Sequence, residues 1–372
     1  MVRLILISFC LQLLLAFTTS RAQNIPDTGI SGVYEVMLGT DDVTYAKKYF
    51  AEYGFRVIDS AIISSKEAQK IYGVNSRLKS YRLQNGTVDS HGLLRILEWE
   101  NPLGEGVGYT PVETIGSRIA VMMTTDIFRL HDIYKTARDT GKKPWLSTEP
   151  IADDLFGLNT GEKDFFNRPV LVRENAVYGK FFNHIFFQRY GYEIPGYGTI
   201  NKNSKLKTSE FTHHDFVINA KSMNQISYLT TALGLKAEAE PTVDGDWLKG
   251  PRRVFQMEPG YSHWYQGFVS PNNICGKLKF FIPRGDKTNK SKNQRIGEKG
   301  ITLHSFYTAK LSFVHDLVAS HENLTSTIIQ KNEFGEKSFI LKDTAGISFQ
   351  IIERKILPKL APKTVLEFVL KE

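Results

Sequence analysis

The stretch GVYEVMLGTDDVTYAKKYFAEYGFRV, residues 32–57, decides the fold class of this chain. Its apolar start is typical of a strand, and Asp42 then offers a side chain that can cap a helix. Four apolar residues between 46 and 53 follow at helical spacing. Gly54 ends the helix, and Phe55 begins another strand. The local pattern is strand, capped helix, glycine, strand.

The same pattern returns three times, in residues 117–146, 213–240 and 301–323. Gly141 and Gly234 repeat the glycine stop, and the last copy has a weaker one. Each copy is followed by segments with strand character, which include residues 93–99, 179–187, 276–282 and 336–354. The repeats therefore predict an α+β protein made of four βαβββ modules.

Three sequence segments carry a family resemblance: TDDVTYAKKYFAEYGF, THHDFVINAKSMNQISYLTTALGL and FILKDTAGISFQIIER. The last contains an Asp-x-x-Gly turn at residues 343–346. Together they resemble the vicinal oxygen chelate superfamily, which includes glyoxalases, bleomycin-resistance proteins and extradiol dioxygenases. The resemblance spans residues 30–356. The alternative is another α+β arrangement that shares the periodicity.

The resemblance implies that modules pair into cupped mixed sheets. We expect the first two modules to form an N-terminal glyoxalase-like half, residues 30–200. The last two would form a C-terminal half, residues 208–356. The polar stretch 201–207 fits a linker between the halves. The motifs are specific for the fold and weak for any one activity.

The first 22 residues predict a signal peptide. Arg3 precedes an apolar run from Leu4 to Phe17, and cleavage is expected after Ala22. The alternative is an uncleaved anchor, for which the apolar run is short. We therefore expect a secreted or periplasmic protein, with no membrane span in the mature chain. Cys10 would leave with the signal, so Cys275 would have no partner for an intramolecular disulfide.

Composition narrows the class of partner. The chain has 372 residues, a formal net charge of +8, and 41% hydrophobic residues. Much of the positive charge lies in residues 201–207 and 284–300, which lack interleaved aromatic residues. This pattern argues against binding of single-stranded nucleic acid. A small-molecule ligand or substrate is the expected partner.

The family resemblance implies metal ligands on the first and last strands of a module. In the N-terminal half these positions fall on Glu35 and Glu98, with His184 or Asn183 as a third candidate. Only one of the last two can face the cup, because side chains alternate along a strand. The set would suit a divalent cation such as Mn²⁺, Mg²⁺, Zn²⁺ or Fe²⁺.

The alternative for Glu35 is an ion pair. A carboxylate in an apolar strand needs a positive partner, and Arg95 or Arg118 could supply it. In that case no metal would be required.

The C-terminal half offers a weaker metal set. We expect His214 to face the cup and His213 to lie on the outer face. Lys279 or Phe280 stands at the last-strand position, and neither can ligate a metal. In the fourth module Leu303 takes the first-strand position, with His304 one residue out of register, and Gln350 takes the last-strand position. Histidines and an amide without a carboxylate bind metals weakly.

Aromatic residues suggest where a ligand would bind. His263, Trp264 and Tyr265 could line a cup for a small ring-bearing molecule. The sequence thus favours a small-molecule-binding protein or a diverged metal-dependent enzyme. The alternatives are an active metal-dependent lyase, isomerase or ring-cleaving dioxygenase, and a scaffold whose cups are filled by side chains.

Overall fold

The computed structural model describes most of the chain after residue 24. The described residues are 25–110, 113–141, 145–153, 170–194, 196–238, 254–255, 263–283, 287–355 and 369–370. The expected signal peptide lies outside them. In this described part, no helix is long and apolar enough to cross a membrane.

Modules one and two follow the expected order of elements. Module one consists of β1 (Glu35–Thr40), α2 (Val43–Glu52), β2 (Phe55–Ile63), α3 (Ser65–Tyr72), β3 (Leu78–Asn85) and β4 (Leu93–Trp99). Module two consists of β5 (Arg118–Thr124), α4 (Ile127–Asp139), β6 (Leu146–Ser147), β7 (Ile151–Asp153), β8 (Leu171–Tyr178) and β9 (His184–Tyr190). The short strand β10 (Tyr192–Glu193) pairs with β20 (Val369–Leu370).

Modules three and four repeat the order with shorter helices. Module three consists of β11 (Thr208–Val217), η1 (Ala220–Ser227), α5 (Tyr228–Thr231), β12 (Lys236–Ala237), β13 (His263–Val269) and β14 (Lys277–Pro283). A 3₁₀ turn, η2 (Ser291–Asn293), precedes module four. Module four consists of β15 (Gly300–Thr308), α7 (Leu311–Ala319), β16 (Leu324–Ser326), β17 (Gln330–Lys331), β18 (Lys337–Asp343) and β19 (Ser348–Glu353). The α+β class with four βαβββ modules is confirmed.

The helix caps and the helix-ending glycine predicted from the sequence have the expected geometry. Asp42 accepts a hydrogen bond from the Tyr45 amide and caps α2, and Asp126 caps α4 in the same way. Gly54 follows α2 with φ of 92°, a conformation that glycine adopts without steric cost.

The modules pair differently from the expectation. A nine-stranded first sheet has the order β16-β18-β19-β15-β1-β4-β3-β2, with β17 as a ninth strand paired to β18, so it joins modules four and one. A nine-stranded second sheet has the order β12-β13-β14-β11-β5-β9-β8-β6, with β7 as a ninth strand paired to β8, and joins modules three and two. The antiparallel pairs β1–β15 and β5–β11 form the two centres.

The pairing of module one with two, and of three with four, is therefore wrong. The repeats show that four modules exist, but the first strands of all four have similar open edges. Which edges meet depends on where the connecting segments cross. Residues 201–207 connect modules two and three, which both belong to the second sheet. The connections before β5 and before β15 each lead from one sheet to the other.

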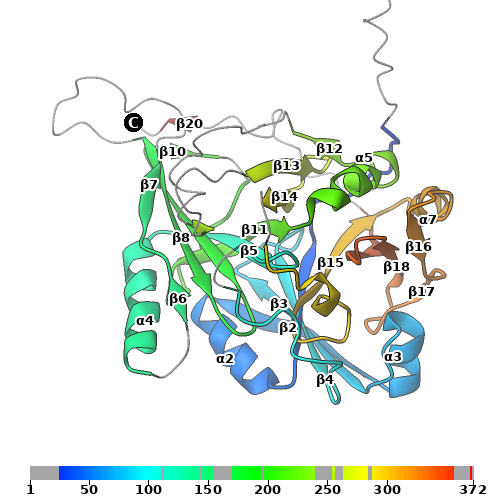
Figure 1. The fold of residues 1–372 in the computed structure, drawn as a ribbon, viewed down its shortest axis with the longest axis horizontal. Helices are drawn as coiled ribbons and strands as arrows, with labels where there is room; N and C mark the ends of the chain where they lie inside the picture. The colour runs from blue at the N-terminus through cyan, green and yellow to red at the C-terminus, as the bar shows by residue number, and fades with distance from the viewer. Residues whose placement is uncertain are drawn as a thin grey trace, which may run out of the picture.

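Helices lie between the two sheets. One core contains Phe50 of α2 and Leu130 of α4 together with Leu94 of the first sheet and Met122 of the second. Another core joins Leu229 of α5 and Val314 of α7. Figure 1 shows α2 near α4, and α5 and α7 on the opposite side of the molecule. Modules one and two thus share a helical core although they belong to different sheets.

The opposite face of each sheet forms a cup. The first cup is the face of the first sheet that carries Glu35, Arg95 and Gln350. The second cup is the face of the second sheet that carries Asp215 and Val217, above a cluster that includes Phe281.

Candidate functional site

The first cup contains a buried network of charges around Glu35. Arg82 Nε donates to Glu35 Oε1 at 2.6 Å, and Arg95 Nε donates to the same oxygen at 3.1 Å. Arg95 Nη2 also donates to Glu35 Oε2, which accepts a further bond from Ser305 Oγ at 2.7 Å. Glu35 and Arg95 are completely buried. The ion-pair alternative with Arg95 is therefore confirmed for Glu35.

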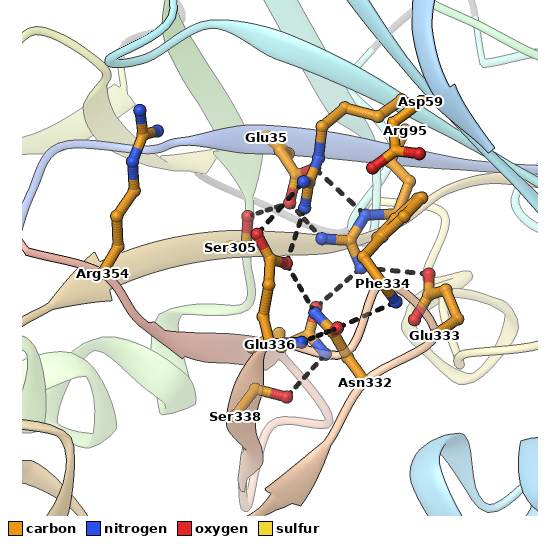
Figure 2. Close-up of polar contacts among 12 residues, drawn as sticks. Glu35, Asp59, Arg95, Ser305, Asn332, Glu333, Phe334, Glu336, Ser338 and Arg354 are labelled. Carbon is orange, nitrogen blue, oxygen red and sulfur yellow. Dashed lines mark hydrogen bonds and ion pairs between the residues drawn. The ribbon is translucent and has the colours of Figure 1, made fainter. Parts of the chain in front are cut away.

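A loop between β17 and β18 closes this cup. Glu333 Oε1 accepts from Arg95 Nη1 at 3.2 Å, and Glu336 accepts from both terminal nitrogens of Arg82 at 3.1 and 2.8 Å. The Phe334 ring lies 4.3 Å from the Arg82 guanidinium carbon. Figure 2 shows how this loop meets Glu35 and Arg95 from the opposite side of the cup. The chain's own side chains fill the centre of the first cup.

The network sets the charge state of Glu35. Burial alone would raise the pKa of this carboxyl group, but Arg82 and Arg95 lower it to about 2. Burial would likewise lower the pKa of the Arg95 guanidinium, but Glu35 and Glu333 hold it well above its usual value. Glu35 and Arg95 therefore both stay ionised at neutral pH.

The donors of the first cup do not fit a divalent cation. Both Glu35 oxygens accept from guanidinium groups, and Gln350 Oε1 accepts from Arg95 Nη1 at 2.9 Å. A cation would need the same lone pairs and would lie beside two positive charges. Gln350 faces a cup, as the sequence indicated, but it is the cup of Glu35 and not the one expected to hold His214.

Glu98 lies on the other face of the first sheet. It is three residues from Arg95, and an odd spacing along a strand reverses the side-chain direction. Its carboxylate pairs with Lys79 at 3.3 Å. The expectation that Glu98 shares the cup with Glu35 is wrong.

His184 and Asn183 do not join Glu35 either, since both belong to the second sheet. Asn183 donates to Thr110 at 3.1 Å. The His184 ring lies in the helical core, 4.4 Å from the Phe182 ring and 5.3 Å from Tyr53, and neither ring nitrogen has a hydrogen-bond partner among the described residues. Arg118, the other proposed partner of Glu35, donates to Gln294 at 3.2 Å.

The double histidine at 213–214 is oriented opposite to the expectation. His214 lies in the interior between the sheets, with its ring 4.9 Å from His304 and 6.0 Å from Phe211. His213 points into the second cup, where its Nδ1 meets the Tyr197 hydroxyl. It is only 1% exposed, so it is not a surface residue. His304 is out of register with the cup, as predicted, and lies on the opposite face from Gln350.

The second cup contains polar groups that are less fully paired. Asp215 is buried; its Oδ1 accepts no hydrogen bond from the described residues and lies 3.6 Å from His213 Nε2. Lys279 is the strand partner of Asp215, and Lys277 is the partner of His213. Lys277 forms an ion pair with Glu238. A Cβ on Gly267 would come within 2.2 Å of the Glu238 carboxylate, so a side chain there would displace this carboxylate from its present position.

Burial shifts the protonation equilibria of this cluster toward neutrality. It raises the pKa of Asp215 to about 7, against the opposing effect of Lys279 and Lys277. Burial and the charge on Lys279 lower the pKa of Lys277 to about 8. Burial also lowers the pKa of His213, which is therefore neutral. Such shifts in one cup are typical of sites that bind or transform ligands.

Aromatic side chains form the apolar part of the second cup. Tyr265, one of the predicted ligand residues, stacks on Phe281 at 5.6 Å. Tyr178 and Phe187 belong to the same cluster. His263 and Trp264 lie on β13, but their side chains are outside the described part of the structure.

The second cup does not fit a metal either. His213 and Asp215 are two donors, and both face lysines. Within the described residues, no group of three histidine, cysteine, aspartate or glutamate side chains could hold a metal ion. The predicted ligands Glu35, Glu98, His184, His214, His304 and Gln350 are divided among the first cup, the interior between the sheets and the partly exposed position of Glu98.

Asp215 is the main residue that sequence reasoning missed. It precedes Gly234 by the same 19 residues by which Glu35 precedes Gly54. That spacing would have placed a carboxylate, rather than His214, in the cup of module three.

Comparisons with known proteins support the fold. The chain resembles a point mutant of glyoxalase I from Zea mays, with a TM-score of 0.51 and 12% identity over 86% of this chain and 93% of that one. Wild-type glyoxalase I from Zea mays gives 0.48, with 11% identity over 87% and 92%. A catechol 2,3-dioxygenase gives 0.24, with 11% identity over 87% and 88%. No family model matches the sequence, and no curated protein matches it.

This chain therefore has the fold of the vicinal oxygen chelate superfamily, in a tandem form with four modules. Identity this low establishes the fold and leaves the activity to be argued from the site.

The Glu35 network generates a stability prediction. Replacing Arg95→Met leaves Glu35 and Glu333 without their shared cation in a buried site, which should lower the free energy of unfolding by about 3–5 kcal/mol. Urea denaturation measures the change. Lys79→Met is the matched control, because Lys79 is partly exposed in its pair with Glu98 and should cost less than about 1 kcal/mol. Equal losses in both variants would contradict the assigned role of the network.

The buried histidines generate a pH prediction. Burial lowers the pKa of His184 and of His214 to about 3, whereas an unfolded histidine titrates near 6.5. Below pH 6.5 the unfolded chain therefore binds more protons. The free energy of unfolding should fall with decreasing pH by up to about 1.4 kcal/mol per pH unit for each histidine.

The variant His184→Phe should reduce this slope between pH 6 and 4, measured by denaturation at each pH. Phe182→Leu is the control, because it disturbs the same ring cluster without removing a titrating group. It should lower stability and keep the slope. An unchanged slope in His184→Phe would refute the assignment.

Proposed function

We propose that the second cup binds a small planar organic molecule that carries an acidic oxygen, such as a carboxylate or phenolate, without the help of a metal. One observation carries the proposal: Asp215 is buried beside lysines in an aromatic cup, and within the described part of the chain one of its oxygens accepts no hydrogen bond. A buried polar atom without a partner costs free energy unless a ligand or water satisfies it.

The chemistry of the cup defines the ligand class. Lys279 offers an ammonium group that suits an anionic oxygen, and Tyr265 and Phe281 offer a ring surface. Asp215, with a pKa near 7, can accept a hydrogen bond from a ligand hydroxyl or donate one to a ligand oxygen. The first cup lacks this capacity, because Arg95 and Arg82 already satisfy Glu35, and the loop that carries Glu333 pairs with these arginines.

Salicylate is a suitable probe, since its ring carries a carboxylate beside a hydroxyl. Calorimetry on the full chain should show saturable binding that Lys279→Met weakens about tenfold, the loss of one charge-assisted hydrogen bond. Lys299→Met, outside both cups, is the control and should bind as the parent does. Prior treatment with a chelator should leave the affinity unchanged.

Three results would count against the proposal: no saturable binding, binding that is indifferent to Lys279→Met, or binding that needs added divalent metal. The last result would favour the alternative of an active metal-dependent lyase, isomerase or dioxygenase.

We also propose that the chain is exported, with residues 1–22 removed as a signal peptide. The support is the sequence alone, a cation at Arg3 followed by a short apolar run and small residues before Gln23. After expression of the full chain in a secreting host, the exported protein should begin at Gln23 by intact-mass analysis. A chain that keeps Met1 and stays with the cells would refute export.

A further inference from the structure

A cavity of about 270 Å³ lies outside both cups, where modules one, two and four meet. Its floor is the end of β1 and the first turn of α2, including Ala46. Trp145 and Phe181 of module two form one side, and Lys299, just before β15, lies at another. Because α2 packs on the helical face of the sheets, this cavity is separate from the proposed ligand site.

The aromatic wall of the cavity is held in place. The Trp145 indole stacks on Tyr49, with ring centroids 5.6 Å apart and planes 12° apart. A Cβ on Gly179 would lie 1.8 Å from the indole, so this position needs a glycine to seat the ring. Phe181 packs edge-on against Tyr45 at 5.4 Å. A preformed wall binds a flat ligand without the entropic cost of ordering side chains.

The charges at the rim of the cavity are paired with one another. Lys299 lies 2.5 Å from Asp41 and 2.7 Å from Glu105, and Lys180 lies 3.2 Å from Glu105. Asp42 is engaged as the cap of α2. Among these lining residues each charge thus has a partner, so the cavity presents an aromatic surface bordered by balanced ion pairs. A charged ligand would have to break those pairs.

We propose that this cavity binds an uncharged single-ring aromatic molecule of the phenol type, stacked in the space beside Trp145 and Phe181. An apolar cavity of about 150 Å³ already admits benzene, so the volume is sufficient for a substituted ring. The hydroxyl of a phenol would reach the carboxylates of Asp41 or Glu105 at the rim. The site is independent of Asp215 and of the proposed function.

The test uses the full chain and 4-methylphenol. Calorimetry should give saturable binding with a dissociation constant of roughly 0.1–1 mM, as expected for so small a ligand. Tryptophan fluorescence should change with the same midpoint. Phe181→Ala should weaken binding at least about tenfold, since it removes one ring of the wall.

Two variants locate the site. Trp145→Phe should keep binding within about threefold by calorimetry, since it keeps a ring, but should lose most of the fluorescence change. Lys279→Met, in the second cup, should leave the affinity for 4-methylphenol unchanged. Thermal unfolding checks that each variant is folded, and Trp145→Phe still tests the site if Phe181→Ala does not fold.

The proposal is overturned by the absence of saturable binding up to about 10 mM ligand, well above the dissociation constant expected for so small a molecule. It is also overturned if a folded Phe181→Ala binds as the parent does, or if Trp145→Phe keeps the full fluorescence change. Weakening by Lys279→Met would assign the phenol to the second cup instead. Benzoate binding as tightly as 4-methylphenol would refute the preference for an uncharged ring.

Discussion

The burial of the central strands on both faces is the constraint from which the other features follow. β1 and β11 are buried along their whole length, as is β5. Successive side chains on such a strand enter two different closed environments, one shared with the helices and one in a cup. A polar side chain in either environment must find a partner or remain unsatisfied.

Glu35 finds two arginines, and those arginines in turn need the carboxylates of the loop before β18. The closure of the first cup is thus a consequence of one buried carboxylate.

Much of the fold could be predicted from the sequence, because its signals are local. The caps at Asp42 and Asp126, the turn that ends at Gly346 and the four repeats depend only on neighbouring residues. The pairing of modules could not be predicted in this way. It depends on contacts between β1 and β15, separated by most of the chain, and each first strand offers a similar apolar edge. The likeness to glyoxalase I confirms the fold and does not replace this information.

The candidate site was predictable only where alternation is regular. Gln350 faces a cup, and Arg95 pairs with Glu35 as the alternative to a metal site proposed, because β19 and β4 pair with their neighbours without interruption. Which cup Gln350 enters depends on the pairing of modules and was not predicted. The register of β11 against β5 shifts between Thr208 and Phe211 and again before His213. From His213 to Phe216 the pairing is regular, so alternation still applies there. His214 stands 20 residues before Gly234 and Asp215 stands 19, the spacing that separates Glu35 from Gly54. That spacing assigns Asp215 and His213 to the cup, and His214 to the opposite face.

The two cups show how the surroundings decide the role of equivalent carboxylates. Glu35 and Asp215 lie at the same distance before the glycine that ends the following helix, and both are buried. Arginines in direct contact lower the pKa of Glu35 to about 2, so its charge is fixed and its oxygens are occupied. The lysines near Asp215 make no direct ion pair with it among the described contacts, and burial prevails, raising its pKa to about 7. A carboxyl group that is permanently charged, and whose two oxygens both accept hydrogen bonds, stabilises the structure. One that can change its protonation near neutral pH, with an oxygen still free, can respond to a ligand. Glu35 is in direct contact with arginines, whereas Asp215 only lies near lysines. This difference separates the first cup, which is structural, from the second cup, to which we assign ligand binding.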